Sequence, residues 1–287
     1  MKDRPNFFIV GSPKSGTTSL YEYLKDVPGI YMSPEKEPKY FHKKNSELNL
    51  KGISDESKYL KLFKNVKDEK VIGEASPTYL LDPESAELIQ KFNPESKIII
   101  ILREPVDRAF SQYLLRVSNG KETRSFKEVI ASRMNTKTGG LREYDLCIDP
   151  GLYYNQVKKY LDVFGSGKVK IIIFEEFVKE PIKTVKEVLE FLGIDAEPSK
   201  KVGKAFNPYG APRGKIGKKI LASKTIKKIS TKIIPQTLRW KVRGKILIKK
   251  DEKPQLSKED RLVLENFYRN DINELKNLIK TKLPWDW

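Results

Sequence analysis

The residues with the clearest chemistry form a short loop near the start of the chain. Residues 11–18 read GSPKSGTT, between an apolar run and a helical pattern. A loop that leads from a strand into a helix gathers backbone N–H groups at the positive end of that helix, which favours anion binding. The glycine spacing is that of a phosphate-binding P-loop, but Thr17 stands where that motif has lysine, and Lys14 lies inside the loop instead. The segment predicts an anion site, and the alternative is a glycine-rich turn without a ligand.

Arg103 is a second candidate anion ligand. It directly follows the apolar run KIIIIL, and open α/β sheets place their ligand crevice at the carboxyl ends of strands. A guanidinium there can bind a phosphate through two parallel hydrogen bonds. Ser111, about two helical turns further on, could add a hydroxyl bond to the same phosphate. The alternative for Arg103 is an ion pair with Glu104 or Asp107, and we expect Arg108 to be structural.

The composition restricts the classes of protein and site. Among 287 residues, 56 Lys and Arg against 38 Asp and Glu give a formal charge of +18, which indicates an anionic partner such as a nucleotide, a polyanion or a membrane surface. The single cysteine, Cys147, excludes an intrachain disulfide and multi-cysteine metal sites, and the single histidine, His42, excludes histidine-rich metal centres. No run approaches the roughly 18 apolar residues of a membrane span, and no secretory signal precedes the first apolar run. The sequence predicts a cytoplasmic protein.

The elements that position these residues alternate between strands and helices. Near-continuous apolar runs predict parallel strands covered on both faces, at 7–10, 30–32, 97–102 and 169–174. Helical patterns cover 17–25, 83–92, 105–117, 152–164 and 181–192, with Asp82 as an expected N-cap and Gly193 as an expected C-cap. The alternation predicts an α/β fold, a three-layer sandwich with a mostly parallel sheet. We expect one domain over residues 1–287, with a basic helical segment at about 213–253 and a C-terminal helix at about 257–280.

Two segments resemble the sulfotransferases that use 3′-phosphoadenosine 5′-phosphosulfate (PAPS). PKSGTTSL, at 13–20, is similar to their 5′-phosphosulfate loop, and LREPVDRAFSQY, at 102–113, is similar to their 3′-phosphate site. The resemblance continues at 151–153, at 212–214 and in a terminal helix ending near Trp285, so it covers nearly the whole chain. KEPKYF, at 36–41, resembles a segment of bacterial and heparan-sulfate-type members.

The resemblance implies roles for individual residues. Lys14 would reach the bridging oxygen and the sulfonate of PAPS, and Glu37 would be the general base, with His42 as the second candidate because histidine titrates near neutrality. The implied donor-binding residues are Pro13, Lys14, Ser15, Gly16, Thr17, Thr18, Ser19, Arg103, Ser111, Tyr209, Arg213, Gly214 and Lys215. The predicted acceptor-side residues are Lys39, His42, Glu74, Ser76 and Tyr153. His42 falls outside the position that the family gives to the glutamate, so Glu37 is preferred as the base.

Two acceptor-side segments keep a structural alternative. Glu37 could be a solvated acid among neighbouring lysines. The segment 74–79 (EASPTY) resembles one of the heparan sulfate 3-O-type enzymes, but Ala75 replaces their lysine, which argues against a heparan-type acceptor. Glu74 could help to orient Lys14, or the segment could be a buried turn in which Pro77 and Tyr79 pack.

The predicted activity is sulfuryl transfer from PAPS, without a metal, to a hydroxyl or, as a second candidate, an amine of a carbohydrate or lipid-linked acceptor. A P-loop kinase and a non-catalytic protein that binds an anionic polymer or membrane are the alternatives. Residues 213–253 carry fifteen Lys and Arg against two acids, with isoleucines interleaved. They could form a solvated layer or contact anionic lipid at the membrane periphery or an anionic glycan. Single-stranded nucleic acid is disfavoured because Trp240 is the only aromatic residue there.

Overall fold

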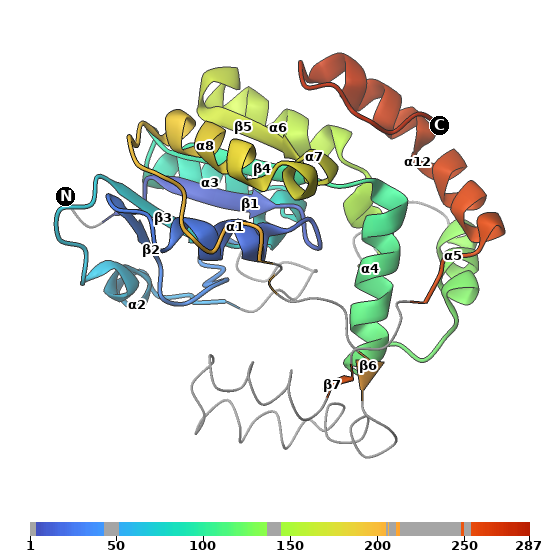
Figure 1. Ribbon diagram of the computed structural model, residues 1–287. Helices are drawn as coiled ribbons and strands as arrows, with labels where there is room; N and C mark the ends of the chain where they lie inside the picture. The colour runs from blue at the N-terminus through green and yellow to red at the C-terminus, as the bar shows by residue number, and fades with distance from the viewer. Residues whose placement is uncertain are drawn as a thin grey trace.

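The fold is organised around one sheet of five strands in the order β2-β3-β1-β4-β5 (Figure 1). The computed structural model describes residues 4–42, 52–136, 145–204, 206 and 254–287, and the backbone of 211–212 and 248–249. All four strand pairings are parallel, which confirms the predicted α/β class. The strands are β1 (Phe7–Gly11), β2 (Ile30–Met32), β3 (Val71–Ala75), β4 (Lys97–Leu102) and β5 (Val169–Ile173).

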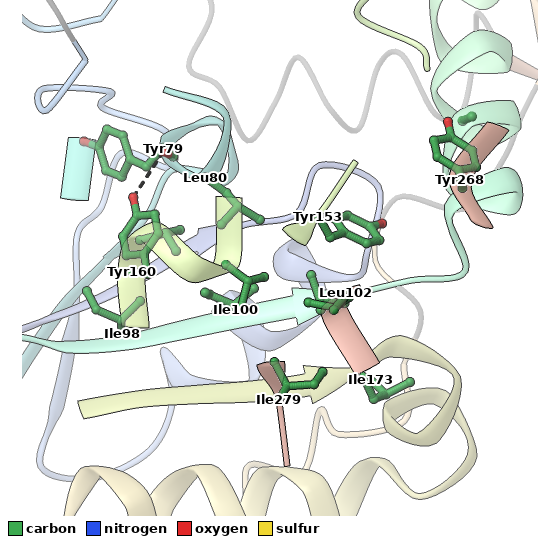
Figure 2. Close-up of a cluster of buried hydrophobic side chains, with 14 of the residues drawn as sticks. Tyr79, Leu80, Ile98, Ile100, Leu102, Tyr153, Tyr160, Ile173, Tyr268 and Ile279 are labelled. Carbon is green, nitrogen blue, oxygen red and sulfur yellow. Dashed lines mark hydrogen bonds between the residues drawn. The ribbon is translucent and has the colours of Figure 1, made fainter. Parts of the chain in front are cut away.

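Helices cover both faces of the sheet. Successive strand side chains point to opposite faces, and here both faces carry apolar side chains. Phe8 and Val10 are buried in one apolar cluster, and Phe7 and Ile9 are buried in the other. The first cluster includes residues of α2 (Glu56–Leu60), α3 (Ser85–Phe92), α4 (Pro105–Ser118), α5 (Phe126–Asn135), α6 (Tyr154–Phe164) and α12 (Lys258–Leu278). The second includes residues of α1 (Thr17–Leu24), α7 (Phe174–Lys179) and α8 (Pro181–Leu192). The predicted three-layer sandwich is confirmed, and Figure 2 shows part of the first cluster, including Ile98, Ile100 and Leu102 of β4.

The sequence pattern missed one strand, β3. Its residues, VIGEA, include a glycine and an acid that interrupt the apolar run. The glycine is required by packing, since a Cβ on Gly73 would lie 2.0 Å from Cε1 of the Phe7 ring. The acid, Glu74, is fully buried, because hydroxyl groups from outside the strand satisfy its carboxylate.

Several predicted boundaries are wrong. The helix expected from Leu152 begins at Tyr154. The helix expected to begin at Pro83 begins at Ser85, because Asp82 does not cap it. The Asp82 carboxylate instead accepts from the Glu84 N–H at 2.9 Å and faces the His42 ring at 3.1 Å. Phe174, expected at the end of a strand, is the first residue of α7.

Beyond residue 206, the structure describes residues 254–287 and the backbone of two short strands. The predicted C-terminal helix is confirmed as α12, and the Ser257 side chain caps it by accepting from the Asp260 N–H at 3.0 Å. The basic segment 213–253 lies outside the described residues except at Ile248–Lys249. There a short strand, β7, pairs with β6 (Ala211–Pro212) in place of the expected helix. No helix in the described ranges is long and apolar enough to cross a membrane.

The strand order places the candidate residues together. β1 lies between β3 and β4, and the chain first adds strands on the β3 side and then on the β4 side. The carboxyl ends of parallel strands share one edge of the sheet, and ligands bind at the edge where the strand order reverses. The loop after β1, Arg103 after β4 and the segment after β3 therefore meet at that edge.

Candidate active site

The β1–α1 loop, residues 12–16, makes a tight turn into the N-terminus of α1. A Cβ on Gly11 would lie 2.5 Å from the Leu80 Cβ, so only glycine fits there. The Ser12 N–H donates to the Ile101 carbonyl at 2.7 Å, which ties the loop to β4. Gly16 has a φ of 83° immediately before α1 begins. The first N–H groups of a helix have no intrahelical acceptor, so this turn leads into a set of donors at the sheet edge.

A buried hydroxyl in this loop lacks a partner. Ser15 is fully buried, and its Oγ has no hydrogen-bond partner among the described residues. Leaving a buried polar atom unsatisfied costs about 1–3 kcal/mol. A bound phosphate or sulfonate oxygen would satisfy it, so the loop fits an anionic ligand.

Arg103 joins the second motif to the loop. Its Nη1 donates to the Lys14 carbonyl at 3.1 Å, and its guanidinium lies over the Phe174 ring at 4.7 Å. Burial lowers the pKa of Arg103 from its ordinary value, against the opposing effect of nearby acids. The alternative ion pairs are absent from the described part of the chain, where Glu104 and Asp107 pair with Arg261 instead. The two predicted donor motifs therefore lie in direct contact.

The remaining residues of the second motif differ in accessibility. Ser111 is partly exposed on α4, the helix that follows Arg103. Arg108 is fully buried and donates from Nη2 to the carbonyls of Cys147 and Ile148, so its expected structural role is confirmed. Arg103 and Ser111 remain the candidate phosphate ligands from this motif.

The other predicted donor residues divide into described and undescribed ones. Pro13, Thr17, Thr18 and Ser19 lie in the loop or the first turn of α1. The Ser19 hydroxyl accepts from the Phe206 N–H at 3.5 Å, so the chain returns across α1 near residue 206. Tyr209, Arg213, Gly214 and Lys215 lie outside the described residues.

Glu37 lies on the segment 36–41, which passes the carboxyl end of β3. Its N–H donates to the Ala75 carbonyl at 3.0 Å. Its carboxylate lies 3.0 Å from Lys36 Nζ and 3.3 Å from Lys39 Nζ, and its side chain is 39% exposed. Burial alone would raise the pKa of Glu37, but the two ammonium groups outweigh it and hold the pKa below its ordinary value. Glu37 is ionised at neutral pH, which suits a general base and equally suits the alternative of a solvated acid.

Backbone conformation distinguishes this site from the rest of the described chain. Among all described residues, the non-glycine residues with positive φ are Lys14 at 72°, Glu37 at 64° and Lys39 at 55°, and all three lie in this site. This region favours glycine, and residues held in it concentrate at functional sites. All three residues were predicted as site residues from the sequence.

Glu74 is the centre of a buried network behind the Glu37 segment. Its Oε1 accepts from the hydroxyls of Tyr59 at 3.0 Å and Tyr79 at 2.8 Å, and its Oε2 accepts from Ser76 Oγ at 2.8 Å. Burial raises the pKa of Glu74 to about 7, against the lowering effect of these three hydroxyls. A carboxylate with three hydroxyl donors is a rigid support rather than an exposed base.

The same hydroxyls hold the Glu37 segment. Ser76 Oγ accepts from the Lys39 N–H at 3.1 Å, and the Tyr79 hydroxyl accepts from the Phe41 N–H at 3.2 Å. The predicted residues Lys39, Glu74 and Ser76 are thus brought together. Tyr79 is fully buried and Pro77 is buried, as the structural alternative expected.

His42 is anchored at both ring nitrogens. Nδ1 lies 3.1 Å from Asp82 Oδ2, and Nε2 lies 2.8 Å from Thr78 Oγ1. The residue is buried. To accept a proton from an acceptor hydroxyl, the ring would have to give up one of these partners, so the geometry favours Glu37 over His42.

Tyr153 lies on the donor side of the site, although the sequence placed it on the acceptor side. Its hydroxyl donates to the Arg103 carbonyl at 2.8 Å and interacts with the Ser12 side chain. Figure 2 shows its ring near Leu102, at the carboxyl end of β4. Tyr153 therefore bridges the β1–α1 loop and the segment that carries Arg103.

Residues that sequence reasoning missed support the site from distant parts of the chain. Tyr59 supports Glu74, and Arg261 and Glu175 both bind Glu104, the residue next to Arg103. No local motif marks them, because each acts through a contact formed only in the folded chain. Two cavities, of about 650 and 580 Å³, contain neither Lys14 nor Arg103 in their linings, and the second is lined in part by Tyr40, Phe41 and His42.

The comparisons with known proteins identify the family. The sulfotransferase domain family matches residues 4–207. A crystal structure of a sulfotransferase from Alicyclobacillus acidocaldarius is 33% identical, covers 98% of this chain and 97% of that chain, and superposes with a TM-score of 0.70. The chain belongs to the sulfotransferase family, and the predicted family is confirmed.

Curated relatives match over part of their length. Carbohydrate sulfotransferase 15 of Mus musculus is 26% identical over 245 residues, which cover 66% of this chain and 44% of the relative. Heparan sulfate glucosamine 3-O-sulfotransferase 3A1 of Mus musculus is 26% identical over 193 residues, and the match covers 67% of this chain and 47% of the relative. A membrane-associated sulfotransferase of Dictyostelium discoideum, kil1, is 35% identical over 121 residues, and the match covers 42% of this chain and 25% of the relative. The chain spans less than half the length of these relatives.

Proposed function

We propose that this chain transfers the sulfuryl group of PAPS to a hydroxyl of a carbohydrate or lipid-linked acceptor and releases 3′-phosphoadenosine 5′-phosphate (PAP). The observation that carries the proposal is the 3.1 Å contact between Arg103 Nη1 and the Lys14 carbonyl. It brings two phosphate-type motifs, far apart in the sequence, into one site. A donor with phosphate groups at both its 5′ and 3′ positions needs two such sites close together.

On the donor side, the proposal assigns the 5′-phosphosulfate to the β1–α1 loop and the 3′-phosphate to Arg103 and Ser111. Backbone N–H groups at the start of α1 and the orphan hydroxyl of Ser15 would hold the phosphate oxygens. Lys14 would neutralise the negative charge that builds on the bridging oxygen as the S–O bond to the 5′-phosphate breaks. The loop 209–215, with Tyr209, Arg213, Gly214 and Lys215, would cover the nucleotide.

On the acceptor side, the proposal assigns Glu37 as general base. The acceptor oxygen attacks sulfur, the bond from sulfur to the phosphate oxygen breaks, and the hydroxyl proton passes to the Glu37 carboxylate. The lowered pKa of Glu37 supports this role because it keeps the carboxylate ionised at neutral pH. A low pKa also limits the driving force for proton removal, so the proton would leave late, as the new O–S bond forms.

The acceptor class rests on the relatives and on charge. The curated relatives include carbohydrate and heparan sulfate sulfotransferases, and the formal charge of +18 suits an anionic acceptor or surface. We propose that the basic segment 213–253 contacts an anionic glycan or an anionic membrane at its periphery, in a cytoplasmic protein. We also propose one domain over 1–287, supported by Asp271 of α12, whose carboxylate accepts from the Tyr153 and Tyr154 N–H groups at the start of α6.

Sulfate transfer from labelled PAPS to a panel of acceptors, with and without magnesium, tests this function. We expect transfer that needs no added metal and is lost in Lys14→Ala. Phosphate transfer from ATP that requires magnesium would favour the kinase alternative instead. Salt-sensitive binding to anionic polymers without transfer, and without any effect of PAP, would favour the non-catalytic alternative.

A further inference from the structure

Three carboxylates act on the Arg103 guanidinium through their charge. The charges of Asp107, Glu175 and Glu104 all act on it and oppose the effect of burial on its pKa. Yet in the described ranges of the chain none of them lies within ion-pair distance of Arg103; Glu104 and Asp107 pair elsewhere. A partly buried arginine beside free carboxylates would ordinarily pair with one of them, so something must hold these acids away.

Arg261, on α12, holds two of the three acids. Its Nη2 lies 2.5 Å from Asp107 Oδ1, and its Nη1 lies 3.4 Å from Glu104 Oε2. Glu104 is further occupied as the N-cap of α4, where its carboxylate accepts from the N–H groups of Val106 and Asp107. Both acids are thus directed toward α12 and the helix end.

Trp285, in the segment that follows α12, holds the third acid. Its Nε1–H donates to Glu175 Oε2 at 3.2 Å, while Glu175 Oε1 accepts from the Glu104 N–H at 3.0 Å. Trp285 is 3% exposed, and its ring lies 6.1 Å from that of Tyr153. Both carboxylate oxygens of Glu175 therefore have partners other than the guanidinium.

We propose that Arg261 and Trp285 are positioning residues for donor binding, which hold Asp107, Glu104 and Glu175 off Arg103 and so leave its guanidinium available to a phosphate. The inference rests on the proposed function, in which Arg103 binds the 3′-phosphate of the donor. It makes the C-terminal helix and the segment after it part of the donor site without direct contact with the nucleotide.

The docking of α12 does not depend on Arg261. Leu264, Tyr268, Ile272 and Leu275 are buried along one face of the helix, and the Tyr268 hydroxyl donates to the Ile148 carbonyl at 2.8 Å. Arg261 is partly exposed at the edge of this face. Arg261→Met keeps the length of the apolar stem and removes the charge, so the variant should fold.

Calorimetric affinities for PAP and AMP test the inference, because AMP lacks the 3′-phosphate. In Arg261→Met, released Asp107 should pair with Arg103 and weaken PAP binding about tenfold, with AMP affinity within about twofold of the unaltered protein. Adding Asp107→Asn should restore PAP affinity, because the competing carboxylate is gone. The control is Lys127→Met, which removes an equal charge from an exposed pair with Glu259 and should change neither affinity.

Trp285→Phe provides an independent test with a matched control. It removes the N–H that holds Glu175 and should weaken PAP binding about threefold, again without an effect on AMP. Trp287→Phe makes the same substitution two residues away, where the indole N–H has no partner among the described residues, and should have no effect.

The possible failures are distinguishable. Equal affinity of the unaltered protein for PAP and AMP would overturn the proposed role of Arg103. The unaltered protein could prefer PAP to AMP, and Arg261→Met and Trp285→Phe could keep that preference unchanged. This result would overturn the positioning role alone. Loss of PAP and AMP binding together, or no rescue by Asp107→Asn, would also overturn it by indicating a general structural effect.

Discussion

The donor side and the acceptor side of this site are built in different ways. On the donor side, the β1–α1 loop supplies backbone N–H groups from a contiguous stretch of chain, and one contact between Arg103 and Lys14 joins it to the second motif. On the acceptor side, Glu37 stands on a short segment without regular secondary structure. That segment is held by Ser76 and Tyr79, which are themselves bound to the buried carboxylate of Glu74.

The difference reflects what each side has to do. Binding a phosphate requires several donors that converge on one volume, and a turn into a helix provides them locally. Presenting a base requires one carboxylate in a fixed position, and here the backbone at Glu37 and Lys39 has positive φ. Such a conformation persists only where surrounding contacts determine it. The β1–α1 loop of the donor side supplies its N–H groups locally and needs long-range contacts only to join Arg103, whereas the position of Glu37 depends on long-range contacts throughout.

The largest expected effect is on the acceptor side. Glu37→Gln should lower turnover by about 10²–10⁴, the usual contribution of a positioned general base, and leave PAP affinity unchanged. His42→Gln is the control for the second candidate base, and it should retain most of its turnover if it folds normally. Single-turnover transfer to the same acceptor compares the two variants. Near-normal turnover in Glu37→Gln with loss in His42→Gln would reverse the assignment.

On the donor side, Lys14→Ala should affect turnover more than affinity. Its contact with the leaving oxygen strengthens as charge builds there, so we expect turnover to fall by about 10²–10³ while PAP affinity changes much less. Rapid-quench measurement at saturating PAPS separates the two quantities. A single-turnover rate within about twofold of the unaltered protein would exclude a role in the chemical step.

A smaller effect is expected from the network that supports the base. Glu74→Gln keeps the shape but disturbs the hydrogen bond to Ser76, and a misplaced base should lower kcat about tenfold without changing PAP affinity. Tyr79→Phe should behave similarly, because the Tyr79 hydroxyl also accepts from the Phe41 N–H. Tyr59→Phe removes a hydroxyl that binds Glu74 alone and should cost less. Equal losses in Tyr59→Phe and Tyr79→Phe would argue against positioning through the Glu37 segment.

The smallest expected effect is a pH dependence of the free energy of unfolding that comes from Glu74. The pKa of Glu74 is raised from 4.5 to about 7, so the folded state binds its proton more tightly than the unfolded state. Its contribution to the free energy of unfolding should be present below about pH 4.5 and lost as the pH rises through about 7. Urea denaturation at several pH values should show this slope in the unaltered protein and a reduced slope in Glu74→Gln. An identical slope in both would contradict the raised pKa.

The fold was largely predictable because its signals are local. β2 and β4 fall where the apolar runs predicted them, and α8 ends at Gly193, whose φ of 78° explains the stop. β3 escaped prediction because a packing glycine and a buried acid interrupt it, and both depend on residues far away in the sequence. The start of α3 was misplaced for a related reason, since Asp82 caps no helix when it is paired with His42.

The site residues also differ in whether their signal is local or depends on contacts between distant residues. Lys14 and Arg103 could be found from spacing, because each lies in a motif at the end of a strand. Tyr153 was predicted as an acceptor-side residue, and its contact with the Arg103 carbonyl could not be predicted, since only the folded chain brings the two together. Arg261 and Glu175 gave no signal, and Trp285 marked only the end of the resemblance, because an ion pair or hydrogen bond between distant segments leaves no pattern in either segment.

The most direct test of the account is whether the two motifs form one site for a nucleotide with two phosphate positions. Titration calorimetry of the unaltered protein with PAP and with AMP, in magnesium-free buffer, measures this. A charge-assisted phosphate contact contributes roughly 1.5–3 kcal/mol, so PAP should bind about tenfold to a hundredfold more tightly than AMP. Arg103→Ala should reduce the affinity for PAP to that for AMP. Equal affinities of the unaltered protein for PAP and AMP would contradict the account.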